Sequence, residues 1–179
     1  PFVSWEDFFR EWLNTEKPYN HTWQLVGRID YLQNFNDFVQ SEEQKILILP
    51  GRGGIGKTKL LHAFAEQFSN SNLTLRFVEE GLPITAENVI NLPKNNCVVV
   101  LDDAHRREED IAVLLAFFRQ NPNLKLIISC RPYGVEYLQI IFREAGIHFR
   151  LIKLLDELKE LNRDDVKALA NQVLSNKYD

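Results

Sequence analysis

Short apolar runs alternate with segments whose apolar residues recur every three or four positions along most of the chain. The first pattern is typical of buried strands, and the second is typical of helices with one buried face. Their alternation predicts βα units, right-handed crossovers and an α/β fold in which helices sandwich a mainly parallel sheet. Five runs are expected to form its strands, namely residues 45–49, 73–78, 97–101, 124–128 and 148–154.

The same pattern divides the chain into three parts. Residues 1–21 are expected to form an N-terminal helix, capped by Ser4, and a polar linker. Residues 22–155 hold the five strands with the helices between them. Residues 156–179 lie beyond the last strand, and Asn162 there can cap a final helix. We expect this helix to begin a second, helical lid subdomain that the sequence covers only in part.

Composition narrows the possible partners. The 179 residues are 45% hydrophobic, enough for a sizeable core, and carry a net charge of −4. This balance gives no broad basic surface, so nucleic acid is not an expected partner. No apolar run has membrane-spanning length and no signal peptide is evident, so a cytoplasmic location without membrane contact is expected. Cys97 and Cys130 are expected to be buried thiols. A chain without methionine is expected to be a piece of a longer protein.

Residues 51–58 read G-R-G-G-I-G-K-T, which is the complete G-x-x-x-x-G-K-[ST] pattern of a phosphate-binding loop. The pattern follows an apolar strand and opens a helix, as its chemistry requires. The four glycines are expected to adopt positive φ and to bring backbone N–H groups close to phosphate. Lys57 would reach the β- and γ-phosphates, and the Thr58 hydroxyl would ligate Mg²⁺. The expected cofactor-binding residues are Gly51, Arg52, Gly53, Gly54, Ile55, Gly56, Lys57 and Thr58.

A second group of polar residues follows the apolar run at 97–101. Asp102 and Asp103 lie at the carboxyl end of this run, where open α/β sheets bind ligands. Asp102 is expected to hold Mg²⁺, directly or through water, and Asp103 to polarise the attacking water. Taken alone, an acidic pair after a strand is as often a surface feature. The phosphate loop upstream favours the Walker B interpretation.

A third candidate is Arg131, which follows the strand expected at 124–128. Its guanidinium would point toward the same edge of the sheet. There it could contact the γ-phosphate and distinguish ATP from ADP, although a surface arginine beside Pro132 and Tyr133 is the simpler alternative. We therefore expect Lys57, Asp103 and Arg131 to carry the chemistry.

The three motifs, together with Val26-Gly27-Arg28 upstream, resemble the STAND class of signalling ATPases, which includes NACHT and NB-ARC domains. The resemblance covers about residues 22–175. It implies ATP or ADP with Mg²⁺ as ligands, adenine contacts from the Val26 backbone and Arg28, and Arg131 as the sensor arginine. It also implies the sheet order 5-1-4-3-2, with the five expected strands numbered along the chain. The expected partners are flanking domains of the same protein and, on activation, further copies of it in an oligomer.

Two departures from that class are visible. No proline follows the last strand, where many members place one against the adenine. The histidine by which many members hold ADP from a further domain is also missing. Trp23 fits either packing near the adenine or packing in the core, and Arg52 fits phosphate, a neighbouring subunit or solvent.

Three functions remain open from the sequence. The first is a nucleotide switch that hydrolyses ATP slowly within a larger signalling or defence protein. The second is an AAA+ or origin-loader ATPase acting on nucleic acid, which would usually carry Asp-Glu rather than Asp102-Asp103. The third is a scaffold that binds nucleotide without hydrolysis. A GTPase is disfavoured, because the N-K-x-D match in the chain, at residues 176–179, follows the expected final helix and not a strand of the sheet.

Overall fold

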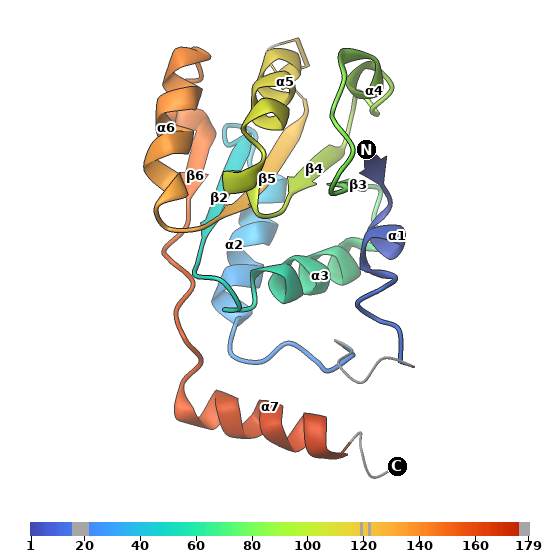
Figure 1. Ribbon diagram of the computed structural model, residues 1–179, viewed down its shortest axis with the longest axis vertical. Helices are drawn as coiled ribbons and strands as arrows, with labels where there is room; N and C mark the ends of the chain where they lie inside the picture. Colours follow the sequence, from blue (N-terminus) through green and yellow to red (C-terminus); the bar gives the residue numbers. More distant parts are fainter. Residues whose placement is uncertain (16–21, 119, 122, 176–179) are drawn as a thin grey trace.

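A single β-sheet with helices on both faces forms the body of the protein (Figure 1). The computed structural model describes residues 1–15, 22–118, 120–121 and 123–175. Part of the polar linker expected before residue 22 lies outside these ranges. Six strands pair within the described residues, in the order β1-β3-β4-β5-β2-β6. They are β1 (Phe2–Val3), β2 (Ile46–Pro50), β3 (Thr74–Val78), β4 (Cys97–Leu101), β5 (Lys125–Cys130) and β6 (Ile152–Leu154).

The sheet has one strand more than the sequence predicted, so the expected count of five is wrong and the stated order lacks β1 at one end. The other five strands lie in the order 5-1-4-3-2 that the resemblance implied. Phe2 and Val3 pair antiparallel with Val78 and Phe77, which adds β1 at the edge beside β3. A run of two residues is too short to give a periodic signal, and so it was missed. All other pairings are parallel, and β5 lies between β2 and β4. The strand that ends before Arg131 therefore separates the strand before the phosphate loop from the strand before Asp102.

The helices and short 3₁₀ turns follow the strands as βα units. They are α1 (Trp5–Phe9), α2 (Ile29–Gln40), α3 (Lys57–Phe68), α4 (Ala86–Ile90), η1 (Ala104–Arg106), α5 (Glu108–Phe118), α6 (Gly134–Glu144), η2 (Phe149–Leu151) and α7 (Arg163–Ser175). Among the described residues, none of the helices is both long enough and apolar enough to cross a bilayer.

Alternate residues of each central strand face opposite layers, because side chains alternate across a strand. In β2, Ile46 and Ile48 pack with the layer of α4, α5 and α6. Leu47 and Leu49 pack with the layer of α1, α2 and α3. These two layers lie on opposite sides of the sheet in Figure 1. The central strands are therefore held from both faces, and their carboxyl ends meet at one edge.

Several helix ends have identifiable causes. Ser4 accepts a hydrogen bond from the Asp7 backbone N–H at 3.1 Å, as predicted for the cap of α1. Asn162 caps α7 by accepting from the N–H groups of Asp164 and Asp165, both at 2.9 Å, which confirms that expectation. Lys125 on β5 ends α2, since its ammonium donates to three carbonyls at residues 38, 39 and 41.

α7 lies apart from the sheet, at the lower end of the molecule in Figure 1. An extended segment after β6 leads to it. The segment before α2 passes between α7 and α3, and the Gln24 backbone N–H donates to the Gln172 side chain of α7 at 2.9 Å. The chain beyond the last strand thus returns to the side of the sheet that carries the phosphate loop.

Candidate functional site

The phosphate loop turns between β2 and α3 through two left-handed glycines. Gly54 has φ of 74° and Gly56, the residue before α3, has φ of 100°. The expectation of positive φ is wrong for Gly51 and Gly53, which are not among the positive-φ residues. Gly51 is required by close packing instead, because a Cβ there would lie 3.0 Å from Ile55 Cγ2 and from Leu158 Cβ.

Gly53 lies under the guanidinium of Arg131. A Cβ built at Gly53 would come within 2.9 Å of Arg131 Nη2 and 3.1 Å of Nη1. The missing side chain therefore lets the arginine reach the loop from β5. Within the described residues, the buried Arg131 Nε has no hydrogen-bond partner. A buried charged donor without a partner is costly, so this nitrogen suits an anionic ligand.

Lys57 lies at the position from which its ammonium could bind a phosphate in the loop. Its side chain is buried, and Nζ donates to the carbonyl oxygens of Gly51 at 2.9 Å and Arg52 at 3.1 Å. Nζ also lies 3.7 Å from Asp103 Oδ1. The ammonium thus rests on loop carbonyls, which are weaker partners than the oxygens of a triphosphate.

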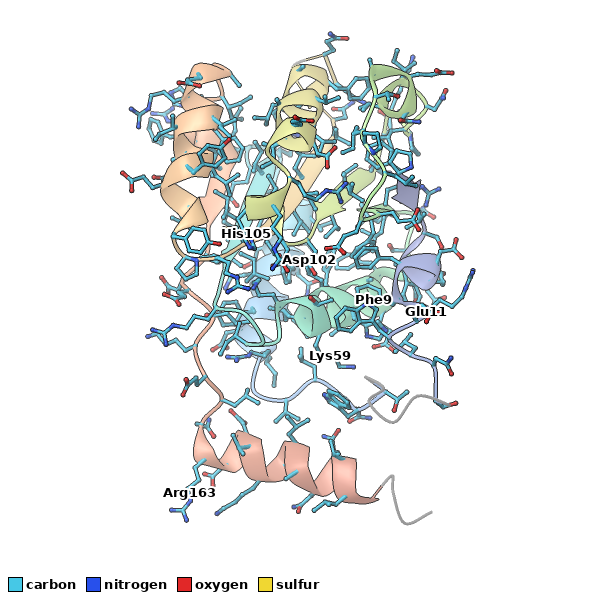
Figure 2. The ribbon with its side chains drawn as sticks, viewed as in Figure 1. Phe9, Glu11, Lys59, Asp102, His105 and Arg163 are labelled. Carbon is cyan, nitrogen blue, oxygen red and sulfur yellow. The ribbon has the colours of Figure 1, made fainter. Side chains whose placement is uncertain are left out.

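Asp102 lies beside Thr58, at the carboxyl end of β4 (Figure 2). The Thr58 hydroxyl donates to Asp102 Oδ2 at 2.7 Å, and the Asp103 N–H donates to Oδ1 at 3.0 Å. Ser129 on β5 also donates its hydroxyl to Oδ1. Burial raises the pKa of Asp102, against the opposing effect of the hydrogen bonds from Ser129 and Thr58. Sequence reasoning gave Ser129 no individual role, although a serine between the apolar residues Ile128 and Cys130 was a usable signal.

Asp103 is held in a conformation unusual for a residue with a side chain. Its φ of 51° places it in the left-handed region, which aspartate tolerates better than most residues. The turn separates its carboxylate from that of Asp102, and the side chain is 38% exposed. Asp103 Oδ1 faces Lys57 Nζ and, at 4.0 Å, His105 Nδ1.

These residues surround a cavity of about 410 Å³, within the size range of small-ligand sites. It opens between the phosphate loop, the segment before α2 and α7. Most of the expected site residues line it: Val26, Arg28, Gly53, Gly54, Ile55, Gly56, Lys57, Thr58, Asp103 and Arg131.

Four expected residues do not line the cavity. Gly51 and Asp102 lie behind the loop, where they shape it and support Thr58. Arg52 is exposed, with Nε 3.8 Å from Glu157 Oε1, so its side chain does not face the cavity. Gly27 has φ of 65°, and a Cβ there would lie 2.3 Å from Asp165 Oδ2. Gly27 therefore permits the approach of α7.

Arg28 lines the cavity but has a partner elsewhere. It is buried, and its Nη2 donates to the Lys159 carbonyl at 2.5 Å, just before α7. Burial lowers the pKa of its guanidinium, partly offset by Tyr31 and Asp165. The residue thus joins the start of α2 to the segment that leads into α7. Its expected contact with adenine remains a prediction.

Sequence reasoning missed much of the apolar part of the cavity. Trp23, which fitted either the adenine or the core, lines it, with Lys59 Nζ 5.8 Å from its ring centre. In Figure 2, Lys59 extends from α3 away from the sheet. The other lining residues come from segments far apart in the sequence, and no local motif marks them: Trp12, Gln24, Leu25, Leu161 and Leu169.

Neither a known protein-family profile nor any curated protein matches the chain. Solved structures do match. A complex of Hsp104 with ADP from S. cerevisiae has a TM-score of 0.62 at 19% identity, and covers 87% of this chain and 25% of that one. A closed-state reconstruction of Hsp104 with ATPγS and FITC casein has a TM-score of 0.66 at 16% identity, and covers 98% and 33%.

These likenesses show the fold alone: the chain has a mixed α/β fold like that of P-loop NTPase domains. More particularly, its mostly parallel six-stranded sheet resembles the domains of AAA+ ATPases. The chain spans only a quarter to a third of the chains it matches. The comparisons do not show the STAND class that the motifs resemble.

Proposed function

We propose that this chain is a nucleotide switch domain of a larger signalling or defence protein, which binds ATP or ADP with Mg²⁺ and hydrolyses ATP slowly. One observation carries the proposal. Thr58 from the phosphate loop and Asp102 from β4 meet at 2.7 Å, with Lys57 buried beside them. A hydroxyl and an ammonium that line the cavity, with a carboxylate that accepts the hydrogen bond of the hydroxyl, are the groups with which P-loop NTPases hold a magnesium nucleotide.

The side chains fit a triphosphate. Lys57 can move from the carbonyls of Gly51 and Arg52 to phosphate oxygens without leaving the loop. The N-terminus of α3 adds its positive end, and two left-handed glycines turn backbone N–H groups toward the anion. Arg131 brings a buried Nε without a partner among the described residues. The third, terminal phosphate of ATP would bind the Arg131 guanidinium. ADP lacks this phosphate, so the arginine would distinguish the two nucleotides.

The oxygens of Thr58 and Asp102 also fit Mg²⁺, which prefers oxygen ligands. No cluster of three or more His, Cys, Asp or Glu residues in the described segments is arranged to hold a metal. Magnesium would therefore rely on these two residues together with phosphate oxygens and water. When bound, it would neutralise charge on the β- and γ-phosphates.

Asp103 is the residue best placed to act on water. Its carboxylate lines the cavity, is partly exposed and lies 3.7 Å from the Lys57 ammonium. A water molecule there would be oriented by Asp103 and would give its proton to the Asp103 carboxylate as it attacks the γ-phosphorus, with ADP as leaving group and phosphate as the second product. One carboxylate without a further polarising group supports slow rather than fast turnover.

The lining of the cavity also indicates how a bound nucleotide would affect α7. Leu161 and Leu169, from the segment around α7, share its lining with the phosphate loop. A nucleotide that contacts both would favour the arrangement in which α7 is docked. Trp23 offers an aromatic surface at the apolar end, where an adenine could stack.

A turnover assay tests the hydrolytic part of this proposal. The parent should release phosphate from ATP slowly in Mg²⁺, and Asp103→Asn should bind ATP normally while its turnover falls about 100-fold or more. Glu109→Gln, a carboxylate change at an exposed position of α5, is the control and should retain the parent rate. An Asp103→Asn rate equal to the parent rate would remove Asp103 from the mechanism. Nucleotide binding without any turnover would favour the non-hydrolysing scaffold.

The likeness to Hsp104 favours a second candidate, an AAA+-type ATPase that works as an assembly. In that case an arginine from a neighbouring copy would complete the site, and loss of such a finger costs about 10³ to 10⁵ in rate. The two candidates differ in how turnover per chain depends on concentration. We expect constant, slow turnover without stimulation by DNA. Turnover that rises steeply with assembly, or with DNA, would support the AAA+ alternative.

A further inference from the structure

A buried histidine lies next to the acidic pair, and nothing above gives it a role. His105 belongs to η1, and its side chain is only 5% exposed. Within the described residues its Nδ1 is buried and makes no hydrogen bond. Figure 2 shows His105 close to Asp102, at the end of β4. A buried ring nitrogen without a partner is unfavourable unless another state of the protein supplies one.

Two residues at the start of α6 pack against His105. Tyr133 contacts it edge to face, with the ring centroids 5.6 Å apart. Gly134 opens α6 so close to it that an added Cβ would lie 3.3 Å from His105 Cβ. Nδ1 is thereby held 4.0 Å from Asp103 Oδ1. The imidazole is positioned for a hydrogen bond that a shift of less than about 1 Å would complete.

Lys57 explains why that hydrogen bond is not yet made. The ammonium lies 3.7 Å from the same Oδ1 atom and competes with His105 for it. When Lys57 turns to a phosphate, its attraction for Asp103 falls. His105 is then the nearest remaining side-chain donor among the contacts of Asp103.

We propose that His105 is a positioning residue, whose Nδ1–H holds the Asp103 carboxylate in place for the attacking water once nucleotide has engaged Lys57. The inference rests on the proposed hydrolysis. It requires the neutral tautomer that carries its hydrogen on Nδ1, which is the state that an acceptor at this position favours.

The surrounding charges agree with a neutral ring. Burial lowers the pKa of His105, and Arg131, Arg106 and Lys57 lower it further, while Asp103 opposes them. The hydrogen bond therefore does not depend on a change of protonation near neutral pH.

Three variants test the assignment in the same chain. His105→Leu fills similar space without a donor, and its turnover should fall about tenfold to 100-fold, as for loss of a second-layer hydrogen bond. Its ATP affinity, measured by titration, should stay within about twofold of the parent. His105→Asn can place an amide donor near the position of Nδ1 and should restore part of the rate. His148→Leu, at an exposed histidine outside the cavity, should have no effect.

A double variant shows whether His105 acts through Asp103. In an Asp103→Asn background, His105→Leu should change turnover by less than about twofold, since the acceptor has already lost its charge. Equal losses with Leu and Asn, accompanied by weaker ATP binding, would show a structural role and overturn the inference. A parent rate in His105→Leu would overturn it while leaving the proposed hydrolysis intact. A parent chain without turnover would overturn both.

Discussion

Burial disfavours the charged form of the carboxylate beneath the phosphate loop. Asp102 has a pKa raised chiefly by burial, even though Ser129 and Thr58 donate hydrogen bonds to it. Between the ordinary pKa of an aspartate and this raised pKa, the folded chain keeps a proton that the unfolded chain has lost. Stability therefore falls as pH rises through that interval, and Asp102 as a carboxylate costs stability at neutral pH. Magnesium would offset that cost.

Asp102→Asn should accordingly stabilise the nucleotide-free protein at pH 7. The amide keeps the acceptor for Ser129 and can donate to the Thr58 hydroxyl, so no partner is lost. We expect a gain of about 1 kcal/mol, or about 2–4 °C in Tm, together with loss of Mg²⁺-dependent nucleotide affinity. Thermal melting at pH 7 and at pH 4 checks it, because the gain should shrink at the lower pH. A lower Tm for the variant at pH 7 would contradict the sign.

Gly53 and Arg131 give a second prediction at the residue scale. A methyl group at Gly53 would meet the guanidinium within 2.9 Å, and the flexible end of the arginine would yield. Gly53→Ala should therefore fold normally but bind a non-hydrolysable ATP analogue about tenfold to 100-fold more weakly, with little change for ADP. Arg131→Ala should show the same selective loss, and Arg52→Ala, at an exposed arginine, should show none.

The comparison is made by titration of both nucleotides in one buffer. Combining Gly53→Ala with Arg131→Ala should add nothing, because the first acts by displacing the second. Equal weakening of ADP and of the analogue would mean that Arg131 does not read the terminal phosphate.

At the scale of elements, the missing side chain at Gly27 leaves room for Asp165 of α7. A Cβ at Gly27 would lie 2.3 Å from Asp165 Oδ2, and its left-handed φ of 65° adds about 1 kcal/mol of strain. Gly27→Ala should push α7 outward and weaken nucleotide binding about tenfold. In an Asp165→Ala background, the same substitution should cost little affinity, since only the backbone strain remains. An equal loss in both backgrounds would show that the docking of α7 does not affect the nucleotide.

The central elements could be predicted from the sequence because their apolar runs are continuous and buried on both faces. The elements at the edges of the sheet could not be predicted in this way. β1 has only two residues, and β6 is shorter than expected because residues 149–151 form η2, where His148 accepts from the Arg150 N–H at 3.2 Å. α4 is stabilised by a capping box between Thr85 and Asn88. Elements that depend on local hydrogen bonds of this kind are only weakly predicted by hydrophobic periodicity.

At the scale of the whole molecule, some residues of the site could be predicted from the sequence and others could not. Residues carried by a motif at a strand end were placed correctly beside one another, as with Thr58 and Asp102 at 2.7 Å. Residues that arrive from distant segments were not foreseen, among them Trp12 and Leu169. Their place depends on how the N-terminal segment and α7 pack around the loop, which no local spacing encodes. The sequence thus predicted which motif residues come together, whereas it did not predict the shape of the cavity.

The most direct test of the account is a calorimetric titration of the parent and of Lys57→Ala with ATP, ADP and GTP in the presence of Mg²⁺. We predict one site per parent chain, weaker binding of GTP than of ATP, and at least a tenfold loss for both adenine nucleotides in Lys57→Ala. Circular dichroism of the variant would show that it remains folded. Unchanged affinity in Lys57→Ala, or GTP bound as tightly as ATP, would contradict the assignment of this cavity as a magnesium–adenine nucleotide site.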